Sequence, residues 1–423
     1  MQNSLKNSTP ESRNIYAGTM QTSKIAQVEV ALQWKSEDAT HCDRMFMDKV
    51  NFWRDVFPGN MAECLNNAEP GEITGQILSV EDLNTVRQAS LIRTIHARQF
   101  NRNPRPGLVI EPRTGRFYPR TFLTGMTDYF PQDSRPFRLL EQDEEYLKVD
   151  LNHPFAGYPA RLAARVIRFL DEKEEHGGRC NDIAVDIIQN GPGMQARPKQ
   201  GETDFFTGSS LERMDNREDA LFYRESRFVG HIDSLASAQI REIYQRFLQA
   251  GMRVLDLMSS WVSHLPAPET AMHLQVTGLG MNAAELDRNP GLQQSVVHDL
   301  NLDPVLPFSD NMFDLAICTV SVEYLTRPFA VFEHVARVLK PGAMFVVTFS
   351  DRWFPTKAIN VWSEIHPFER MGLVLDYFRK SGKFTDLSTE SIRGYPRPED
   401  DKYAGSMALA DPVYAVWGRV QKA

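Results

Sequence analysis

The sequence predicts an α/β protein whose doubly wound parallel sheet, in residues 217–423, is preceded by a mainly β (α+β) domain in residues 24–172. In the C-terminal part, short continuous apolar runs alternate with segments of helical spacing, as in parallel sheets that helices cover on both faces. In the N-terminal part, apolar and polar residues alternate, which predicts strands with one buried face. The length of 423 residues also exceeds the roughly 100–200 residues of one domain.

The N-terminal part begins with the strand-like stretch "KIAQVEVALQW" from Lys24. Further strands are predicted at residues 137–140, 146–149 and 163–169, with Pro- and Arg-rich turns between them. These turns and short strands indicate a domain that is mainly β.

Two other segments predict irregular structure. Residues 1–23 are polar and lack the apolar core of about 7–15 residues that a secretory signal needs, so we expect a flexible N-terminus. Residues 173–216 include the breaker-rich run "NGPGMQARPKQGETDFFTGSS", which predicts a linker between the two domains.

The composition excludes several classes of protein. The net charge of -8 provides no basic field for nucleic acid, and no apolar run approaches the ~18 residues of a membrane span. The four cysteines are far apart and form no C-x-x-C pair, which argues against a zinc site and a disulfide framework. H-E-x-x-H is absent too, so we expect no metal. These features predict a cytoplasmic protein.

In the C-terminal part, a helix is predicted over "SLASAQIREIYQRFLQAG", ending at Gly251. Five strands are predicted after it, at "RVLDL", "LQVTGLGM", "QSVVHDL", "FDLAICTVSV" and "AMFVVTFS". Ligands of open parallel sheets bind beyond the carboxyl ends of the strands, and polar or small residues follow most of these runs. Asn282, with Glu285 three residues later, predicts a helix N-cap with its capping box at that edge.

The ordered set "VLDLMSSW", "VTGLGMN", "HDLNLDPVLPFSDNMFDLAICTVSVEYL" and "HVARVLKPGAMFVVTFS" resembles class I S-adenosylmethionine (SAM)-dependent methyltransferases over about residues 220–423. The resemblance implies a Rossmann-like sheet and SAM as the cofactor. It implies that Asp256 ends the first strand and that Asp299 receives the adenine amino group. The cofactor-binding residues that it implies are Asp256, Met258, Ser259, Ser260, Gly280, Met281, Asn282, Asp299 and Leu300.

Two features of the sequence depart from that family's pattern. Met258-Ser259-Ser260-Trp261 stands in place of the glycine-rich loop, and Gly280 stands where the family usually has an acid for the ribose hydroxyls. Backbone and hydroxyl groups of the serines can still form hydrogen bonds, but without glycine the loop approaches the cofactor less closely. Trp261 is expected either near the methyl donor or in the core.

Methyl transfer is an in-line displacement, so the protein must position a nucleophile and remove its proton. The candidate catalytic residues are Tyr223, His231 and His264, because they precede the entering helix or follow the first strand. The alternative for His231 is a helix start with Asp233 as the N-cap. The loop "SIRGYPRPEDDKYAG" could close over a substrate through the three residues Arg393, Tyr395 and Tyr403.

Residues 28–72, and later "YLKVDLNHPFAGYPARLAARVIRF", resemble an FKBP-type prolyl isomerase of the bacterial kind with an insertion in its flap. The resemblance covers roughly residues 26–172, and Asp43 matches the family's acid after the first strand. The helix pattern of the family is met with Asn in place of Gly at residues 60–68, and no A-Y-G element is found. We therefore expect a structural, dimerising or substrate-gating role, with homo-oligomers as one outcome.

The leading hypothesis is a SAM-dependent methyltransferase that acts on a small-molecule thiol, hydroxyl or amine, with the N-terminal domain as a lid or assembly module. A second hypothesis is a protein methyltransferase whose FKBP-like domain grips a peptide. A third is a non-catalytic binding or chaperone-like protein. Cofactor binding separates the first two hypotheses from the third.

Overall fold

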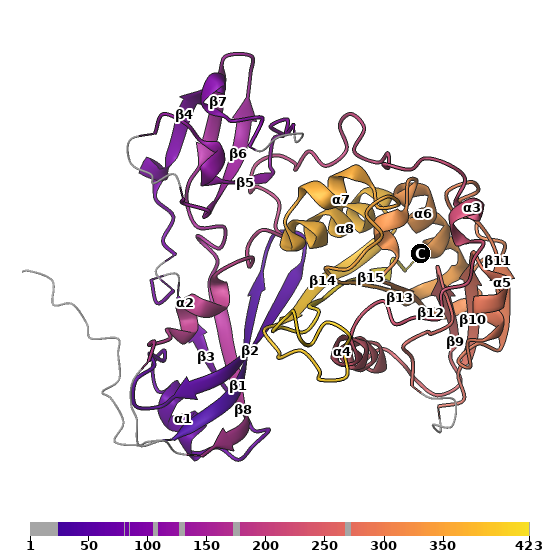
Figure 1. The fold of residues 1–423 in the computed structure, drawn as a ribbon, viewed down its shortest axis with the longest axis horizontal. Helices are drawn as coiled ribbons and strands as arrows, with labels where there is room; N and C mark the ends of the chain where they lie inside the picture. The colour runs from indigo at the N-terminus through magenta and orange to yellow at the C-terminus, as the bar shows by residue number, and fades with distance from the viewer. Residues whose placement is uncertain are drawn as a thin grey trace, which may run out of the picture.

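The computed structural model describes residues 24–422 apart from Val80, Asn84 and the ranges 105–108, 127–131, 172–177 and 267–271. The predicted flexible N-terminus, residues 1–23, lies outside the described residues, as does the first part of the predicted linker. In the described part, one 11-stranded sheet runs through both halves of the chain, and a separate four-stranded sheet projects from the N-terminal half (Figure 1).

The C-terminal half contains α3 (Asp219–Tyr223), α4 (Ser234–Gln245), β9 (Arg253–Leu257), β10 (Gln275–Gly280), α5 (Ala283–Asp287), β11 (Gln294–Val297), β12 (Phe313–Thr319), η4 (Val322–Tyr324), α6 (Pro328–Val338), β13 (Leu339–Phe349), α7 (Asn360–Glu364), α8 (Pro367–Ser381), β14 (Phe384–Arg393) and β15 (Val413–Val420). Strands β11, β10, β9, β12 and β13 run parallel in that order. β15 is antiparallel to both of its neighbours, β13 and β14. The predicted α/β fold is confirmed, with a mixed sheet in place of a wholly parallel one.

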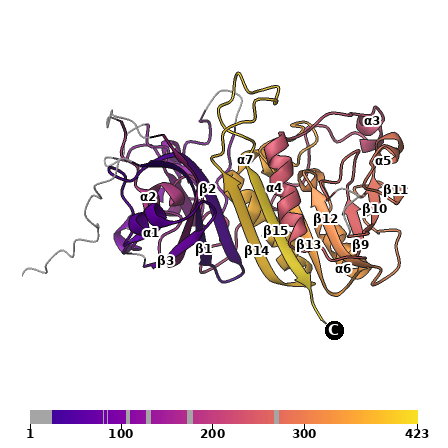
Figure 2. The same ribbon diagram turned by 90° about the horizontal axis from the view of Figure 1, so that it is seen from below.

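Helices cover both faces of this sheet, as the continuous apolar strands predict. On one face, Ile240 and Tyr244 of α4 pack in a cluster with Val346 of β13. On the other face, Phe332 of α6 lies 5.1 Å, ring to ring, from Phe345 of the same strand, and α8 packs beside it. Figure 2 shows α4 on the face opposite α6. Successive side chains of a strand point to opposite faces of the sheet, so the neighbouring residues Phe345 and Val346 of β13 contact helices on opposite sides.

Two predicted boundaries differ from those observed. α4 ends at Gln245, and a turn follows before Gly251, whose φ of 77° is the left-handed conformation that favours glycine. β12 ends at Thr319, earlier than its apolar run, because Val320 adopts a φ of 48° and turns the chain out of the sheet.

The N-terminal half contains β1 (Ile25–Lys35), β2 (Thr40–Asn51), α1 (Met61–Asn67), β3 (Ile73–Leu78), η1 (Ala89–Leu91), β4 (Ile92–His96), η2 (Ala97–Gln99), β5 (Phe117–Pro119), η3 (Arg120–Phe122), β6 (Pro136–Gln142), β7 (Tyr146–Asp150) and β8 (Ala160–Leu170), with α2 (Ile183–Ile188) after it. The large sheet continues through β2, β1, β8 and β3. The small sheet consists of β4, β7, β6 and β5, which come between β3 and β8 in the sequence. The strands expected around residues 24–34, 137–140, 146–149 and 163–169 are confirmed. The N-terminal domain is mainly β, and its resemblance to FKBP stays a prediction.

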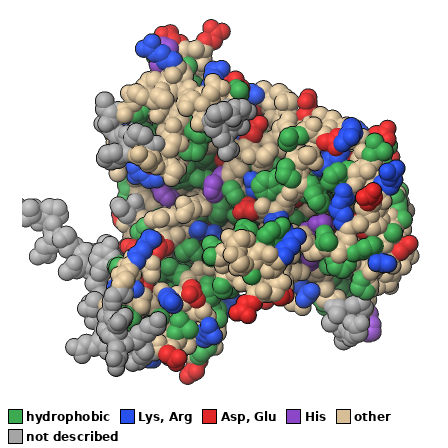
Figure 3. Space-filling view, in the orientation of Figure 1, with side chains coloured by type: hydrophobic (Ala, Val, Ile, Leu, Met, Phe, Trp, Pro, Cys, Tyr) green, Lys and Arg blue, Asp and Glu red, His purple; other side chains and the backbone are tan. Residues whose placement is uncertain are grey.

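The surface carries both signs of charge side by side. Lys, Arg, Asp and Glu are interspersed over the visible face, with apolar side chains between them (Figure 3). Among the described residues, no helix combines the length and the apolar character needed to cross a bilayer.

The two halves meet where β2 pairs in parallel with β14. A row of alternating charges crosses this junction. Arg44 of β2 contacts Glu29 of β1 at 2.8 Å and Glu390 of β14 at 3.1 Å. Arg165 of β8 contacts Glu29 at 3.1 Å, and Arg246, just after α4, contacts Glu390 at 2.6 Å. Both glutamates are buried, so their charges depend on these arginines for compensation.

A second set of buried contacts surrounds Asp43 of β2, whose side chain is fully buried. It accepts hydrogen bonds from Trp34 Nε1 at 2.8 Å, from Ser391 Oγ at 2.8 Å and from Gln195 Nε2 at 3.2 Å. These donors come from β1, from β14 and from the predicted linker. The linker therefore contributes to the core at this point, and Asp43 ties three separate segments together.

We predict that Asp43→Ala lowers the free energy of unfolding by about 1–3 kcal/mol, because it leaves buried donors on Trp34 and Ser391 without an acceptor. Urea denaturation followed by tryptophan fluorescence measures the shift. Asp48→Ala is the matched control: Asp48 lies on the same strand, but it is exposed, and it accepts a surface hydrogen bond from half-buried Gln27. Equal midpoints for the two variants would contradict the role given to Asp43.

Candidate functional site

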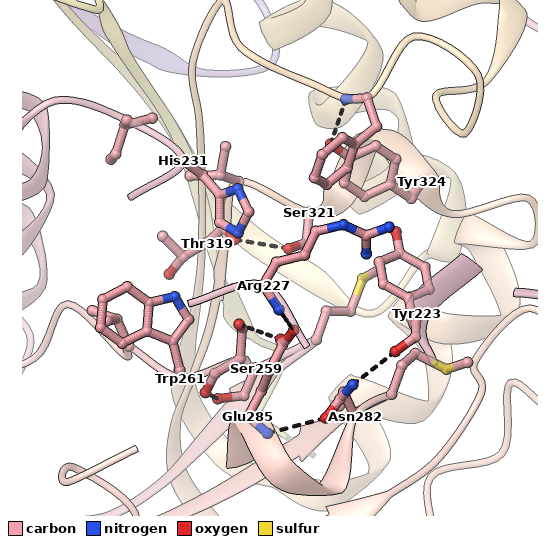
Figure 4. A pocket seen from close by; sticks show the side chains of 18 of the residues that line it. Tyr223, Arg227, His231, Ser259, Trp261, Asn282, Glu285, Thr319, Ser321 and Tyr324 are labelled. Carbon is pink, nitrogen blue, oxygen red and sulfur yellow. Dashed lines mark hydrogen bonds between the residues drawn. The ribbon is translucent and has the colours of Figure 1, made fainter. Parts of the chain in front are cut away.

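A cavity of about 630 Å³ lies at the carboxyl ends of β9, β10 and β12 and beside the turn after β11 (Figure 4). Parallel strands end at the same edge, which is why polar residues from four separate places in the sequence meet here. Three other segments complete the wall: α3 with the residues after it, the loop after β13, and the β14–β15 connection.

The structure brings all of the predicted catalytic and cofactor-binding residues to this one cavity. Its lining includes the candidate catalytic residues Tyr223, His231 and His264, together with Asp256, Met258, Ser259, Ser260, Gly280, Met281, Asn282, Asp299 and Leu300. Placement in one cavity does not by itself test the role given to each side chain. Among the described residues, no group of three or more His, Cys, Asp or Glu side chains is arranged to hold a metal ion.

The loop after β9 approaches β10 closely although it lacks glycine. Ser259 N–H donates to the carbonyl oxygen of Leu279 at 2.8 Å, and Met258 takes the left-handed conformation with a φ of 56°. A Cβ added to Gly280 would lie 2.1 Å from the carbonyl oxygen of Ser259. The glycine that allows the close approach is therefore on the neighbouring strand, and any side chain at position 280 would push the loop away.

Asp256 lies at the base of this loop and is almost completely buried. Burial raises the pKa of its carboxyl to about 7, although the hydrogen bond from Ser259 Oγ, at 2.6 Å, favours the charged form. The carboxyl therefore changes its protonation state near neutral pH.

Glu285 and Arg227, which we did not predict as site residues, shape the same wall. Glu285 accepts hydrogen bonds from Ser260 Oγ at 2.7 Å and from the backbone N–H of Arg227 at 2.6 Å. Asn282 caps α5 as predicted, because its Oδ1 accepts a hydrogen bond from the backbone N–H of Glu285 at 3.1 Å. The Glu285 side chain does not bond back to the backbone N–H of Asn282, so the predicted capping box is not formed. Asn282 Nδ2 also donates to the carbonyl oxygen of Tyr223 at 2.8 Å. The start of α5 thus holds residues 223–227 over the cavity.

The three candidate bases have different surroundings. The Tyr223 hydroxyl is buried, which raises its pKa. His264 shares a hydrogen bond of 2.7 Å between Nδ1 and Ser237 Oγ, and burial lowers its pKa to about 4. His231 lies against Phe354 with 5.6 Å between ring centroids, and its pKa is lowered, first by burial. No hydrogen bond to its ring is found among the described residues, and Figure 4 shows the ring inside the cavity.

Asp233 is confirmed as the N-cap of α4, since its Oδ1 accepts from Ala236 N at 2.8 Å, and His231 lines the cavity at the same time. Trp261 is half-buried at the cavity wall and donates from Nε1 to the carbonyl oxygen of Val229 at 3.3 Å, so it is not a core residue.

The end of β14 and the loop after it contribute one of their three predicted residues to the cavity. Of Arg393, Tyr395 and Tyr403, only Tyr403 lines it. Arg393 bonds to Ile187 O and Tyr395 bonds to Glu29, so both face the N-terminal half.

The strands are parallel, the loop after β9 packs closely against β10, and a cavity lies at the carboxyl ends of the strands. These features together define an α/β domain of the kind that binds nucleotide cofactors. Residues 260–347 match the family model described as "Methyltransferase domain". The chain is 31% identical over 109 residues to the ubiquinone/menaquinone biosynthesis C-methyltransferase UbiE of Paraburkholderia phymatum, and 29% identical over 109 residues to that of Paraburkholderia phytofirmans. Each alignment covers 26% of this chain and 44% of the relative, so this chain spans less than half the length of these relatives.

Solved structures also resemble part of the chain. A methyltransferase in complex with the Trm112 activator of Haloferax volcanii is 16% identical, with a TM-score of 0.34 over 44% of this chain and 89% of the other. A SAM-dependent methyltransferase from Archaeoglobus fulgidus is 15% identical, with a TM-score of 0.33 over 44% of this chain and 93% of the other. The family match confirms the prediction of a methyltransferase domain, of the class that uses SAM as its cofactor.

The raised pKa of Asp256 predicts a pH dependence of stability. Between its ordinary value of 3.8 and about 7, the folded protein holds a proton that the unfolded chain releases. This carboxyl therefore makes the fold less stable as the pH rises through that window, and the loss levels off above about 7. We predict that the melting temperature of Asp256→Asn falls less than that of the native protein, by several degrees, between pH 5 and pH 8.

Calorimetric melting at both pH values measures this difference. Asp287→Asn, at an exposed position on α5, is the control and should follow the native protein. Parallel curves for Asp256→Asn and the native protein would show that Asp256 stays charged throughout.

Proposed function

We propose that the protein is a SAM-dependent methyltransferase that methylates a small-molecule acceptor. The observation that carries this proposal is the shared cavity. Its lining combines the predicted cofactor residues with His231, whose ring has no hydrogen bond to any described residue, and residues 260–347 of the chain match a methyltransferase domain. A volume of about 630 Å³ is within the range of about 300–1,000 Å³ for small-molecule sites.

The residues present fit the cofactor. Gly280 leaves a cradle beside the Ser259 carbonyl that a Cβ would fill, and Asp256 is a buried carboxyl beneath the same loop. Asp299 would accept from the adenine amino group, with Leu300 packed on the ring. Gly280 stands where the family usually has the acid that holds the ribose. Glu285 is our candidate for this role, since it lines the cavity five residues later, on α5.

When bound, SAM supplies an activated methyl group on a sulfonium. The chain's own residues must orient the acceptor and hold the proton that it loses. The acceptor would use a lone pair to take up that methyl group, so the residues of the cavity would have to hold the lone pair in position and receive the proton that the acceptor loses. His231 would take the proton, because its ring faces the cavity and its lowered pKa keeps it neutral and able to accept.

The acceptor classes follow from this chemistry. A thiol, a hydroxyl or an amine needs a base and a site that positions its own lone pair, and we propose that the cavity provides both. The similar Paraburkholderia proteins are named C-methyltransferases, and this adds an electron-rich carbon to the candidate acceptor atoms.

For the N-terminal half we propose the role of an assembly module. Its contacts support this role, because they hold the start of the β14–β15 connection, and residues further along this connection line the cavity. Tyr395 bonds to Glu29, and its ring stacks on Phe46 at 4.5 Å. A Cβ on Gly394 would lie 2.5 Å from the carbonyl oxygen of Phe46, so this segment lies directly against β2.

The FKBP resemblance is consistent with this role and not with isomerisation. The small sheet lies between β3 and β8, where a flap insertion is expected. Asp43, the residue that matches the family's acid, is fully buried and hydrogen-bonded to the rest of the chain, so it is not open to a ligand. We propose that homo-oligomers, where they form, use other surfaces of this half.

The cofactor proposal predicts that S-adenosylhomocysteine, the demethylated product, binds with micromolar affinity in a calorimetric titration. Asp299→Asn should weaken binding about 10–100-fold, because an amide presents a donor to the adenine amino group and loses a charge-assisted bond. The variant keeps the local turn, since an amide oxygen can still accept from the backbone N–H groups of Asn301 and Leu302.

Asp303→Asn is the matched control, in the same loop but outside the cavity lining. Its affinity should equal that of the native protein. Unchanged affinity in Asp299→Asn would mean that the adenine end is assigned wrongly, and no binding by the folded native protein would favour a non-catalytic role.

The assembly proposal predicts that Tyr395→Ala frees the segment 396–410, because it removes both the hydrogen bond to Glu29 and the stack on Phe46. Amide hydrogen exchange in that segment should become several-fold faster, while exchange in β9 and β10 stays unchanged. Tyr146→Ala, at an exposed tyrosine of the small sheet, is the control. Unchanged exchange in 396–410 would show that the N-terminal half does not hold this segment.

A further inference from the structure

The cavity has a second end that the cofactor residues do not occupy. The cofactor residues follow β9, β10 and β11. The opposite end is formed by the loop after β13, with Arg352, Trp353 and Phe354, and by the β14–β15 connection, with Lys402 and Tyr403. Because β13, β15 and β14 lie on the other side of β9 and β12 in the sheet, these residues approach the cavity from the side away from β10 and β11.

Two cations face one ring at this end. The Arg352 guanidinium lies 4.6 Å from the centre of the Tyr403 ring, and Lys402 Nζ lies 5.0 Å from it. Lys402 forms no ion pair among the described residues. Among the described residues, the one carboxylate within ion-pair distance of Arg352 is that of Asp411, at 3.4 Å. The other oxygen of this carboxylate already pairs with Arg397 at 2.8 Å. Much of the positive charge at this end is therefore left for a ligand.

The carboxylates of the same region are already bonded. Asp233 caps α4, accepts from Asp411 N and contacts Arg397 at 3.6 Å. Asp401 contacts Arg397 at 3.0 Å, and Asp400 accepts from Ser234 Oγ at 3.2 Å. None of these carboxylates neutralises Lys402.

His231 lines the same cavity, and its pKa responds to the charges around it. After burial, Glu285 makes the largest contribution and acts to raise the pKa, whereas Arg227, Arg352 and Lys402 each act to lower it. Glu285 already accepts two hydrogen bonds, from Ser260 and Arg227. Phe354 and Tyr403 add aromatic rings to the part of the lining that holds Arg352 and Lys402.

We propose that this end is an acceptor subsite for a small planar molecule that carries a carboxylate, with the anion held by Arg352 and Lys402 and the ring packed against Phe354 and Tyr403. This proposal rests on the proposed function and adds the substrate class to it. The same cations have one other candidate ligand, the carboxylate of the cofactor's own methionine part. The two sources share their chemistry, and the test separates them.

The test is a set of calorimetric titrations with two probes, 4-hydroxybenzoate and its neutral amide, 4-hydroxybenzamide, with and without saturating S-adenosylhomocysteine. We expect the benzoate to bind at least ten-fold more tightly than the amide, with a preference that shrinks as salt is added. Arg352→Gln and Lys402→Gln should each weaken benzoate binding about five-fold or more, and leave the amide and S-adenosylhomocysteine unaffected. Lys383→Gln, at an exposed site outside the cavity lining, is the control.

Three results would overturn the subsite. Equal affinity for the two probes, or no binding of either, removes the argument for an anionic ring. Weaker S-adenosylhomocysteine binding in Arg352→Gln or Lys402→Gln assigns the cations to the cofactor. Failure of the native protein to bind S-adenosylhomocysteine overturns the proposed function instead, and the titrations without it still decide whether the cavity prefers the anion.

Discussion

The parallel pairing of β2 with β14 is the constraint on which the arrangement of the two halves depends. It makes one sheet of two domains, and the row of charges from Arg165 to Arg246 crosses it. Buried glutamates are costly unless they are paired, and removal of one partner of a buried pair costs about 3–5 kcal/mol. Arg44 contacts Glu29 and Glu390 together, so moving the two halves apart would break its ion pair with Glu390 and leave each glutamate with fewer partners.

The sequence predicts the part of this structure that is local or periodic. The strands of the C-terminal half are continuous apolar runs, and the residues after them converge because parallel strands end at one edge. That geometry alone brings Asp256, Gly280 and Asp299 together. The β2–β14 junction leaves no such trace, because Asp43 and Ser391 are 348 positions apart and each fits an ordinary strand. Arg227 was missed for a similar reason: its contact with the site is made by a backbone N–H, which every residue type but proline carries.

The loop after β9 shows how a motif can change its residues and keep its geometry. A close approach between two backbones needs one position without a Cβ, and the structure has it at Gly280, on the strand that receives the loop. Met258 then carries the left-handed conformation that glycine would adopt more easily. The same glycine removes the usual ribose acid, and Glu285 on α5 is the carboxylate of the cavity lining that we propose in its place. The two departures from the family pattern are therefore one structural change.

The two ends of the cavity depend on different parts of the chain. The cofactor end is built within the β9–β11 region, and α5 holds its cover through Asn282 and Glu285. The opposite end includes the β14–β15 connection, whose first residues lie against β2 and bond to Glu29. If the N-terminal half has the proposed assembly role, a change in it would reach the cavity through Tyr395 and affect the side of Lys402 and Tyr403, while the loop above Asp256 would stay as it is. Fusion to a second domain can in this way tune what the cavity accepts without altering how its cofactor end is held.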